Sequence, residues 1–153
     1  MANYPAPWMF PQICAQTDPK VMVNGDVIFT ISGGPIQILN LMSTCITADD
    51  TTASTLQYSS TPTYGSAKAI SAASATLASA TVGTTAMLTP TALTTAPTLV
   101  TGANGGVQLG LVAQNHITVL EGTITIVIGV GSTTGKWRHS LYFVPMAPGV
   151  TVS

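Results

Sequence analysis

The stretch GTITIVIGVGSTTGKWRHSLYFVP, residues 122–145, carries the clearest structural pattern in this chain. Its first half alternates isoleucine with threonine or valine, and its second half alternates large apolar with polar side chains from Trp137 to Phe143. A period of two is typical of β-strands that bury one face. Because the short glycine-bounded loop 131–135 separates the two halves, we predict that they pair as an antiparallel hairpin.

Upstream, similar short strands recur between glycine and proline breaks. Strand-like alternation covers residues 27–32 and 36–42, and the GGP at residues 33–35 joins them as a hairpin or as a sharp corner. Residues 44–58 predict a strand, a turn at Asp49–Asp50 and another strand. This part of the chain is therefore expected to consist of short strands and turns.

Residues 64–98 form a long stretch rich in alanine, threonine and serine, with one charged residue. Alanine would permit a helical turn around residues 68–77, but the β-branched threonines favour short strands and loops. Two further short strands are predicted at residues 107–112 and 116–120. With no persistent helical period, the chain is predicted to be all-β. We expect an antiparallel β-sandwich or jelly-roll-like barrel formed by a single domain, residues 20–153.

The N-terminal residues 1–19 have a different character. Four prolines block helix formation and favour an extended arm, and the aromatic side chains among them favour packing over solvation. At about 3.1 Å per residue the arm reaches roughly 50–60 Å, which exceeds the radius of a domain of this size. We therefore expect the arm to clamp a neighbouring chain. The candidate contact residues are Tyr4, Trp8, Met9, Phe10 and Ile13.

Charge is scarce along the whole chain. Its 153 residues include four basic and five acidic ones, whereas a typical soluble domain of this length has about 38 charged residues. The folded surface, roughly 7,000 Å², would offer about one charge per 800 Å², the area that one partner contributes to a standard interface. A net charge of −1 gives little protection against association. We therefore expect a structural, assembled protein whose surface is largely occupied by other subunits.

Several classes of partner and compartment are disfavoured. Basic residues are too few to leave a footprint for nucleic acid or an anionic membrane. The N-terminus lacks the pattern of a signal peptide, and the most apolar stretch, residues 117–130, is interrupted by glutamate, glycine and threonines. Cys14 and Cys45 belong to no metal or redox spacing. Two buried or half-buried thiols are favoured, and a disulfide between them is left open.

One pattern is similar to a metal site. The sequence GLVAQNHITVLEG occupies residues 110–122. Its His116 and Glu121 fall near the ligand spacing of metal-binding cupins, but Thr118 stands at the place of the second histidine. Two ligands do not make a transition-metal site, and no serine, cysteine or carboxylate pair has the spacing of a catalytic centre. We therefore expect no metal, no cofactor and no enzyme activity.

Three segments flank the alanine-rich middle: FTISGGPIQILNLMS (29–43), EGTITIVIGVGSTTGKWRHSLYFVPM (121–146) and APGVTVS (147–153). In this order, after an apolar proline-containing N-terminus, the chain resembles the small decoration, or cement, proteins of tailed bacteriophages. The resemblance implies a β-sandwich or jelly-roll-like fold, usually trimeric, on the outer surface of an icosahedral head. There it would clamp neighbouring subunits of the major capsid protein against the pressure of the DNA. The resemblance implies no catalytic residue.

The expected partners are thus the major capsid protein and further copies of the same chain, in a closed homotrimer. The expected location is the outer surface of the virion, after synthesis in the host cytoplasm. Two alternatives stay open. Another virion component, such as a head fibre or tail protein that binds a host glycan, would have exposed aromatic side chains in a loop groove. A cupin-like metal enzyme would bind a metal ion.

Overall fold

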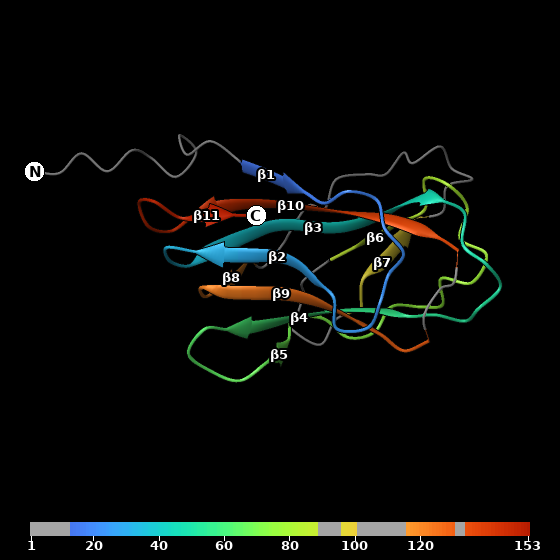
Figure 1. Cartoon of the computed structure of the whole chain (residues 1–153), viewed down its shortest axis with the longest axis horizontal. Coiled ribbons are helices and arrows are strands. Elements are labelled where there is room, and N and C mark those ends of the chain that lie inside the picture. The colour runs from blue at the N-terminus through green and yellow to red at the C-terminus, as the bar shows by residue number, and fades with distance from the viewer. Residues whose placement is uncertain (1–12, 89–95, 101–115, 131–133) are drawn as a thin grey trace, which may run out of the picture.

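The computed structural model describes residues 13–88, 96–100, 116–130 and 134–153, and these residues form strands and loops without a helix (Figure 1). The strands are β1 (Ile13–Gln16), β2 (Val27–Ser32), β3 (Ile36–Thr47), β4 (Leu56–Pro62), β5 (Lys68–Ala69), β6 (Thr85–Met87), β7 (Thr98–Val100), β8 (Ile117–Val119), β9 (Gly122–Ile128), β10 (Lys136–Pro145) and β11 (Thr151–Val152). The predicted all-β fold is confirmed. Among the described residues, no helical segment has the length and hydrophobicity that crossing a membrane requires.

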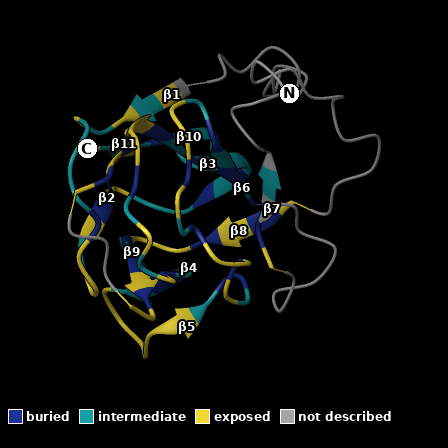
Figure 2. Ribbon diagram, turned by 90° about the vertical axis from the view of Figure 1, so that its right-hand side faces the viewer, coloured by how far each residue is buried: buried dark blue, intermediate teal, exposed yellow. Residues whose placement is uncertain are grey.

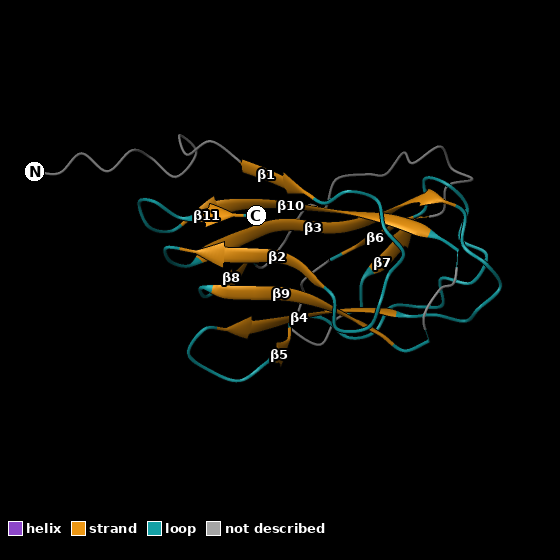
Figure 3. Ribbon diagram, viewed as in Figure 1, coloured by secondary structure: helices purple, strands orange, loops and turns teal. Residues whose placement is uncertain are grey.

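Two antiparallel sheets make up a β-sandwich (Figure 3). Sheet A has the order β1-β10-β3-β6-β7, and β8 pairs with the beginning of β3. Sheet B has the order β11-β2-β9-β4-β5. The longest ladders join β10 to β3 and β9 to β4. Two strands from the C-terminal third of the chain therefore lie in the interior of the two sheets.

The predicted hairpin of residues 122–145 is wrong, although both of its strands exist. β9 lies in sheet B between β2 and β4, whereas β10 lies in sheet A between β1 and β3. Each strand has one buried face, and the two faces meet in the same core from opposite sheets. Facing sheets pack about 10 Å apart, so a short loop can cross between the layers as well as close a hairpin. Alternation alone does not distinguish the two arrangements.

The GGP break at residues 33–35 is a sharp corner and not a hairpin. β2 belongs to sheet B, and β3, which follows the break, belongs to sheet A. Gly33 has a φ of +85°, and a Cβ at this position would lie 2.8 Å from the carbonyl oxygen of Gly149. Glycine is the residue that tolerates both this backbone conformation and so close an approach of two loops.

The alanine-rich middle contains no helical turn at residues 68–77. Instead, this segment runs along the outer edge of β4, beginning with the pairing of β5. The backbone N–H of Tyr58 donates a hydrogen bond to Ser71 Oγ at 3.0 Å. The backbone N–H of Leu56 donates to Ser74 Oγ at the same distance. Satisfying the backbone groups of a sheet edge outweighs the weak helix preference of the alanines.

One apolar core lies between the sheets, and the buried residues gather in the middle of the ribbon in Figure 2. As predicted, alternate residues of β9 and β10 point into this core. The buried residues at these alternate positions are Ile124, Ile126, Ile128, Trp137, His139, Leu141 and Phe143. Full burial of one large apolar side chain contributes about 1.5–3 kcal/mol, so β9 and β10 anchor both sheets to each other.

The strand β2 departs from the simple alternation expected of it. Ile28 and Phe29 are both buried, because a register shift against β9 places two successive residues on the inner side. Val27 is exposed as a result. A β-bulge of this kind inserts one residue into the ladder and has no signature of its own in the hydrophobic pattern.

Candidate functional site

Three polar side chains from three strands meet inside the apolar core. Ser43 of β3 lies between Tyr58 of β4 and His139 of β10. The Ser43 hydroxyl oxygen is 2.7 Å from His139 Nδ1 and 2.8 Å from Tyr58 Oη. Tyr58 Oη also lies 3.3 Å from the carbonyl oxygen of Ala86 on β6. All four residues are buried, so this cluster links the two sheets by hydrogen bonds through the core.

One arrangement of protons gives each of these contacts a donor and an acceptor. His139 Nδ1–H donates to Ser43, the Ser43 hydroxyl donates to Tyr58, and the Tyr58 hydroxyl donates to the Ala86 carbonyl. The opposite tautomer would place the proton on His139 Nε2, which is buried without a hydrogen-bond partner in the described part of the chain. Since an unpaired buried N–H costs about 1–3 kcal/mol, the tautomer with its proton on Nδ1 is favoured.

The electrostatic environment keeps this cluster uncharged. Burial, and to a smaller extent the positive charge of Lys20, lower the pKa of His139 to about 4, against the opposing effect of Asp26. Burial also raises the pKa of the Tyr58 hydroxyl. A serine beside a neutral histidine occurs in many hydrolytic enzymes. Here the Ser43 side chain is fully buried, so a substrate has no access to it in this structure.

A second buried contact fixes the loop between β3 and β4. Trp137 Nε1 donates to Asp49 Oδ2 at 3.2 Å, and the backbone N–H of Asp50 donates to Asp49 Oδ1 at 3.0 Å. A Cβ on Gly135 would lie 2.6 Å from the same Oδ1 atom, so the residue before β10 has to be small. The two aspartates predicted in a turn thus lie in the connecting loop, and one of them is anchored against the core.

Both cysteines are free thiols. Cys14 is exposed on β1 and Cys45 is buried on β3, and β10 lies between these two strands. Burial raises the pKa of the Cys45 thiol, and the carboxylate of Asp49 raises it further. The disulfide that the sequence left open is therefore absent from the structure.

The cupin-like candidates His116 and Glu121 lie on either side of β8, and both are exposed. The second histidine of the sequence, His139, lies in the core. Within the described ranges, no group of three histidine, cysteine, aspartate or glutamate side chains could hold a metal ion. The geometry thus brings no further ligand to His116 and Glu121 from these ranges.

A cavity of about 340 Å³ lies beside the segment that precedes β6. It is lined by residues 76–81, Thr84 and Leu99. None of these lining residues carries a charge. The cavity therefore offers hydroxyl and apolar groups to a small molecule, but no side chain for acid–base or metal chemistry.

The predicted clamp residues fall into two groups. Four of them lie outside the described residues, and their contacts stay a prediction: Tyr4, Trp8, Met9 and Phe10. Ile13 begins β1, which pairs with β10 of the same chain and places Ile13 opposite Phe143. Further along, the backbone of Lys20 forms an isolated antiparallel β-bridge with the backbone of Trp137. Residues 13–20 therefore follow sheet A of their own domain, although the predicted arm extended to residue 19.

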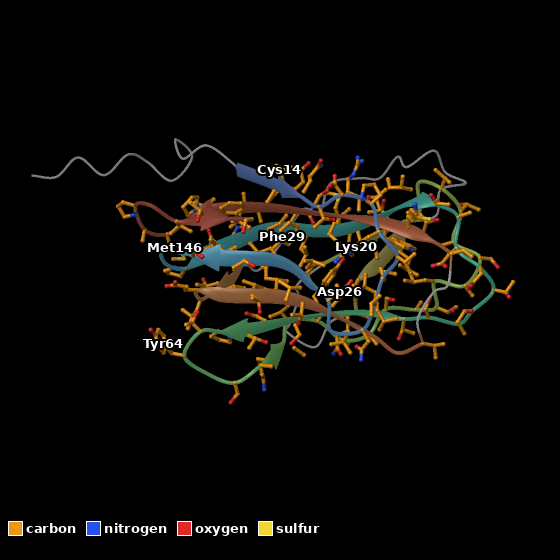
Figure 4. All side chains as sticks on the ribbon, in the orientation of Figure 1. Cys14, Lys20, Asp26, Phe29, Tyr64 and Met146 are labelled. Carbon is orange, nitrogen blue, oxygen red and sulfur yellow. The ribbon has the colours of Figure 1, made fainter. Side chains whose placement is uncertain are left out.

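All the charged residues of the sequence lie in the described part of the chain. Four of them are exposed: Asp18, Lys68, Glu121 and Lys136. Asp49 is buried, and the remaining four are half-buried. Two of these, Lys20 and Asp26, form an ion pair with 3.0 Å between Nζ and Oδ2 (Figure 4). The accessible surface of 8177 Å² thus has very little exposed charge.

No protein-family model, no curated protein and no solved structure matches this chain.

Proposed function

We propose that this protein is a capsid decoration protein, which binds the outside of an icosahedral bacteriophage head and stabilises contacts between major capsid protein subunits. The observation that carries the proposal is the low exposed charge: four exposed charged side chains on 8177 Å² of surface. Removing an unpaired charge from water is strongly unfavourable. A surface with so few charges can therefore be covered by other subunits over much of its area.

The fold supports the same role. A decoration protein needs contact area on a stable body, because weak contacts with several subunits add up through multivalency. The buried cluster of Ser43, Tyr58 and His139 joins the sheets into such a body. On the outer side of β9, the half-exposed Thr123 and Thr125 offer hydrogen bonds to a partner without adding charge.

Binding to phage heads tests the proposal. The proposal expects a major capsid protein gene beside that of this chain, and the full-length protein is mixed with undecorated heads assembled from the product of that gene. The heads are then pelleted and imaged by electron microscopy. We expect saturable binding at fixed positions on the outer surface, and decorated heads that resist heating better than bare ones. Heads that stay bare at micromolar protein would contradict the proposal.

We also expect the isolated protein to form a closed trimer. The reason is again the low charge of the chain. Copies with so little net charge repel one another weakly, so a free monomer would be poorly protected against association. A trimer matches the three-fold positions that an icosahedral shell offers. Sedimentation equilibrium at micromolar concentration should give three times the mass of the chain. A stable monomer under these conditions would count against this assembly.

One observation favours a second candidate function. Tyr64 is 93% exposed in the loop between β4 and β5. An aromatic side chain presents an apolar face and a polar tip, and this combination suits a sugar ring. A virion component that binds host glycans would use such a residue. The same protein is also mixed with host cells and pelleted with them. Binding to cells together with no binding to heads would favour this function.

A further inference from the structure

Asn24 and Gly25 are the central residues of a tight turn in the segment that connects β1 of sheet A to β2 of sheet B (Figure 1). The backbone N–H of Asp26 donates a hydrogen bond to the Val23 carbonyl oxygen at 3.1 Å and closes the turn. Of the two central residues, Gly25 alone has a positive φ, +86°. A four-residue turn with a positive φ at its third residue only is of type II.

An asparagine followed by a glycine has a reaction of its own, spontaneous deamidation. The glycine nitrogen loses its proton to hydroxide and attacks the side-chain Cγ of the asparagine, with little steric hindrance because glycine has no Cβ. The new N–Cγ bond closes a five-membered succinimide ring, and the side-chain nitrogen leaves as ammonia. Water then adds to one of the two ring carbonyl carbons and opens the ring to aspartate or isoaspartate. The reaction therefore needs water, hydroxide and access of the glycine nitrogen to Cγ.

Contacts with β9 hold both reacting groups away from this reaction. The backbone N–H of Gly25 donates to the Ile126 carbonyl oxygen at 2.9 Å, so the nitrogen keeps its proton. Asn24 Oδ1 accepts a hydrogen bond from the backbone N–H of Ile128 at 3.1 Å. In a type II turn the ψ angle of the second residue is about +120°, whereas closure of the succinimide ring requires a negative ψ. Deamidation therefore requires the turn to separate from β9 first.

We propose that Asn24 is a deamidation site that the packing of its turn on β9 protects, so that the modification takes place in copies whose turn is open. Asn24 is exposed, so water and hydroxide reach an opened turn without unfolding of the core. This inference is independent of the proposed function. The amount of modified protein increases with the time that the turn spends open, during folding or afterwards.

Formation of isoaspartate prevents the turn from closing again. In the intact turn, the N–H of Gly25 and the carbonyl oxygen of Asp26 both bond to the backbone of Ile126, at 2.9 and 3.0 Å. Isoaspartate carries one additional methylene in the backbone before Gly25, so the longer chain no longer places both groups on Ile126. A transient opening is thereby converted into a permanent one.

Mass spectrometry of the full-length protein tests the protection. The protein is kept at mildly alkaline pH, either folded in buffer or unfolded in guanidinium chloride, and samples taken at successive times are digested with trypsin. Cleavage after Lys20 and Lys68 gives the peptide 21–68, which contains Asn24 but not the second Asn–Gly pair of the sequence, Asn104–Gly105. Fragmentation of this peptide locates the mass change of deamidation. We expect Asn24 to deamidate at least about tenfold faster in the unfolded protein, because opening of the turn breaks its hydrogen bonds to β9.

Equal rates in the folded and unfolded protein would overturn the protection by β9, and an unfolded protein that keeps Asn24 intact would overturn the site itself. The variant Asn24→Asp is the matched control for the product, because it has the charge of a deamidated copy on a normal backbone. Hydrogen exchange of the Gly25 amide, followed by NMR, should stay within about threefold of the wild-type rate in this variant.

In isoaspartate copies purified by chromatography, we expect the Gly25 amide to exchange at least about tenfold faster than in the wild type. Isoaspartate copies whose Gly25 amide exchanges as slowly as that of the wild type would overturn the inference that the opening is permanent.

Discussion

Replacing Gly122 with alanine should lower the free energy of unfolding by about 4 kcal/mol or more, from two effects of similar size. Gly122 has a φ of +147°, a backbone conformation that side chains rarely adopt. An added Cβ would also collide with the backbone of Thr61 and Pro62 on the neighbouring strand β4 and with that of Thr63, which follows it. Because these are backbone atoms of a sheet ladder, they cannot move aside without breaking pairs between β4 and β9.

A matched substitution separates the two effects. Gly25 has a φ of +86°, but no atom lies within 4 Å of the position a Cβ would take. Gly25→Ala should therefore show the backbone strain without the collision, about 1–2 kcal/mol. Urea unfolding of both variants, followed by intrinsic tryptophan fluorescence, gives the comparison. If the two variants lose the same stability, the close packing of β9 on β4 is not what the structure indicates.

Acidification from pH 7 to pH 4 should remove about 3 kcal/mol of stability through His139 alone. Burial holds the pKa of this residue at about 4 in the folded protein, below the ordinary value of 6.5 that it regains on unfolding. Between these two values the unfolded state binds the proton and the folded state does not. Stability therefore rises with pH in this window, is complete above pH 6.5 and is lost as the pH falls toward 4.

Two histidine variants isolate this contribution. His139→Gln removes the titrating group from the core, so its free energy of unfolding should change less between pH 7 and pH 4 than that of the wild type. His116→Gln changes an exposed side chain. Its free energy of unfolding should change between pH 7 and pH 4 by as much as that of the wild type. In the wild-type protein, the His139 ring resonances followed by NMR should titrate near pH 4. If the His139→Gln variant lost as much stability between pH 7 and pH 4 as the wild type, His139 would not be the source of this pH dependence.

The hydrophobic pattern predicted which residues face the core better than it predicted which strands pair. The alternation from Trp137 to Phe143 correctly identified the inner face of β10. The same alternation suggested a hairpin with β9, because a strand with one buried face looks identical whether its neighbour in sequence lies beside it or across the core. In this chain β2 and β3, β3 and β4, and β9 and β10 all lie in different sheets.

The buried polar cluster had no local signal in the sequence. Ser43 lies 15 residues from Tyr58 and 96 residues from His139, and the three come together only through sheet topology. The one sequence feature that pointed to such a cluster was a histidine at an inward position of a predicted strand. A buried polar side chain needs a hydrogen-bond partner, but the sequence does not say which residue supplies it. The bulge that buries both Ile28 and Phe29 was likewise invisible, since one inserted residue changes the ladder without changing the composition.

The sheet order also determines when the chain can fold. β1, β2, β3 and β4 do not pair with one another: β1 and β3 pair with β10, and β2 and β4 pair with β9. As the chain leaves the ribosome, its first four strands therefore emerge without the neighbours that complete their ladders. Folding that depends on such distant pairings is slow, and unpaired apolar strands are prone to aggregate in the meantime. Synthesis that stops before β9 would release a chain from which neither complete sheet can form.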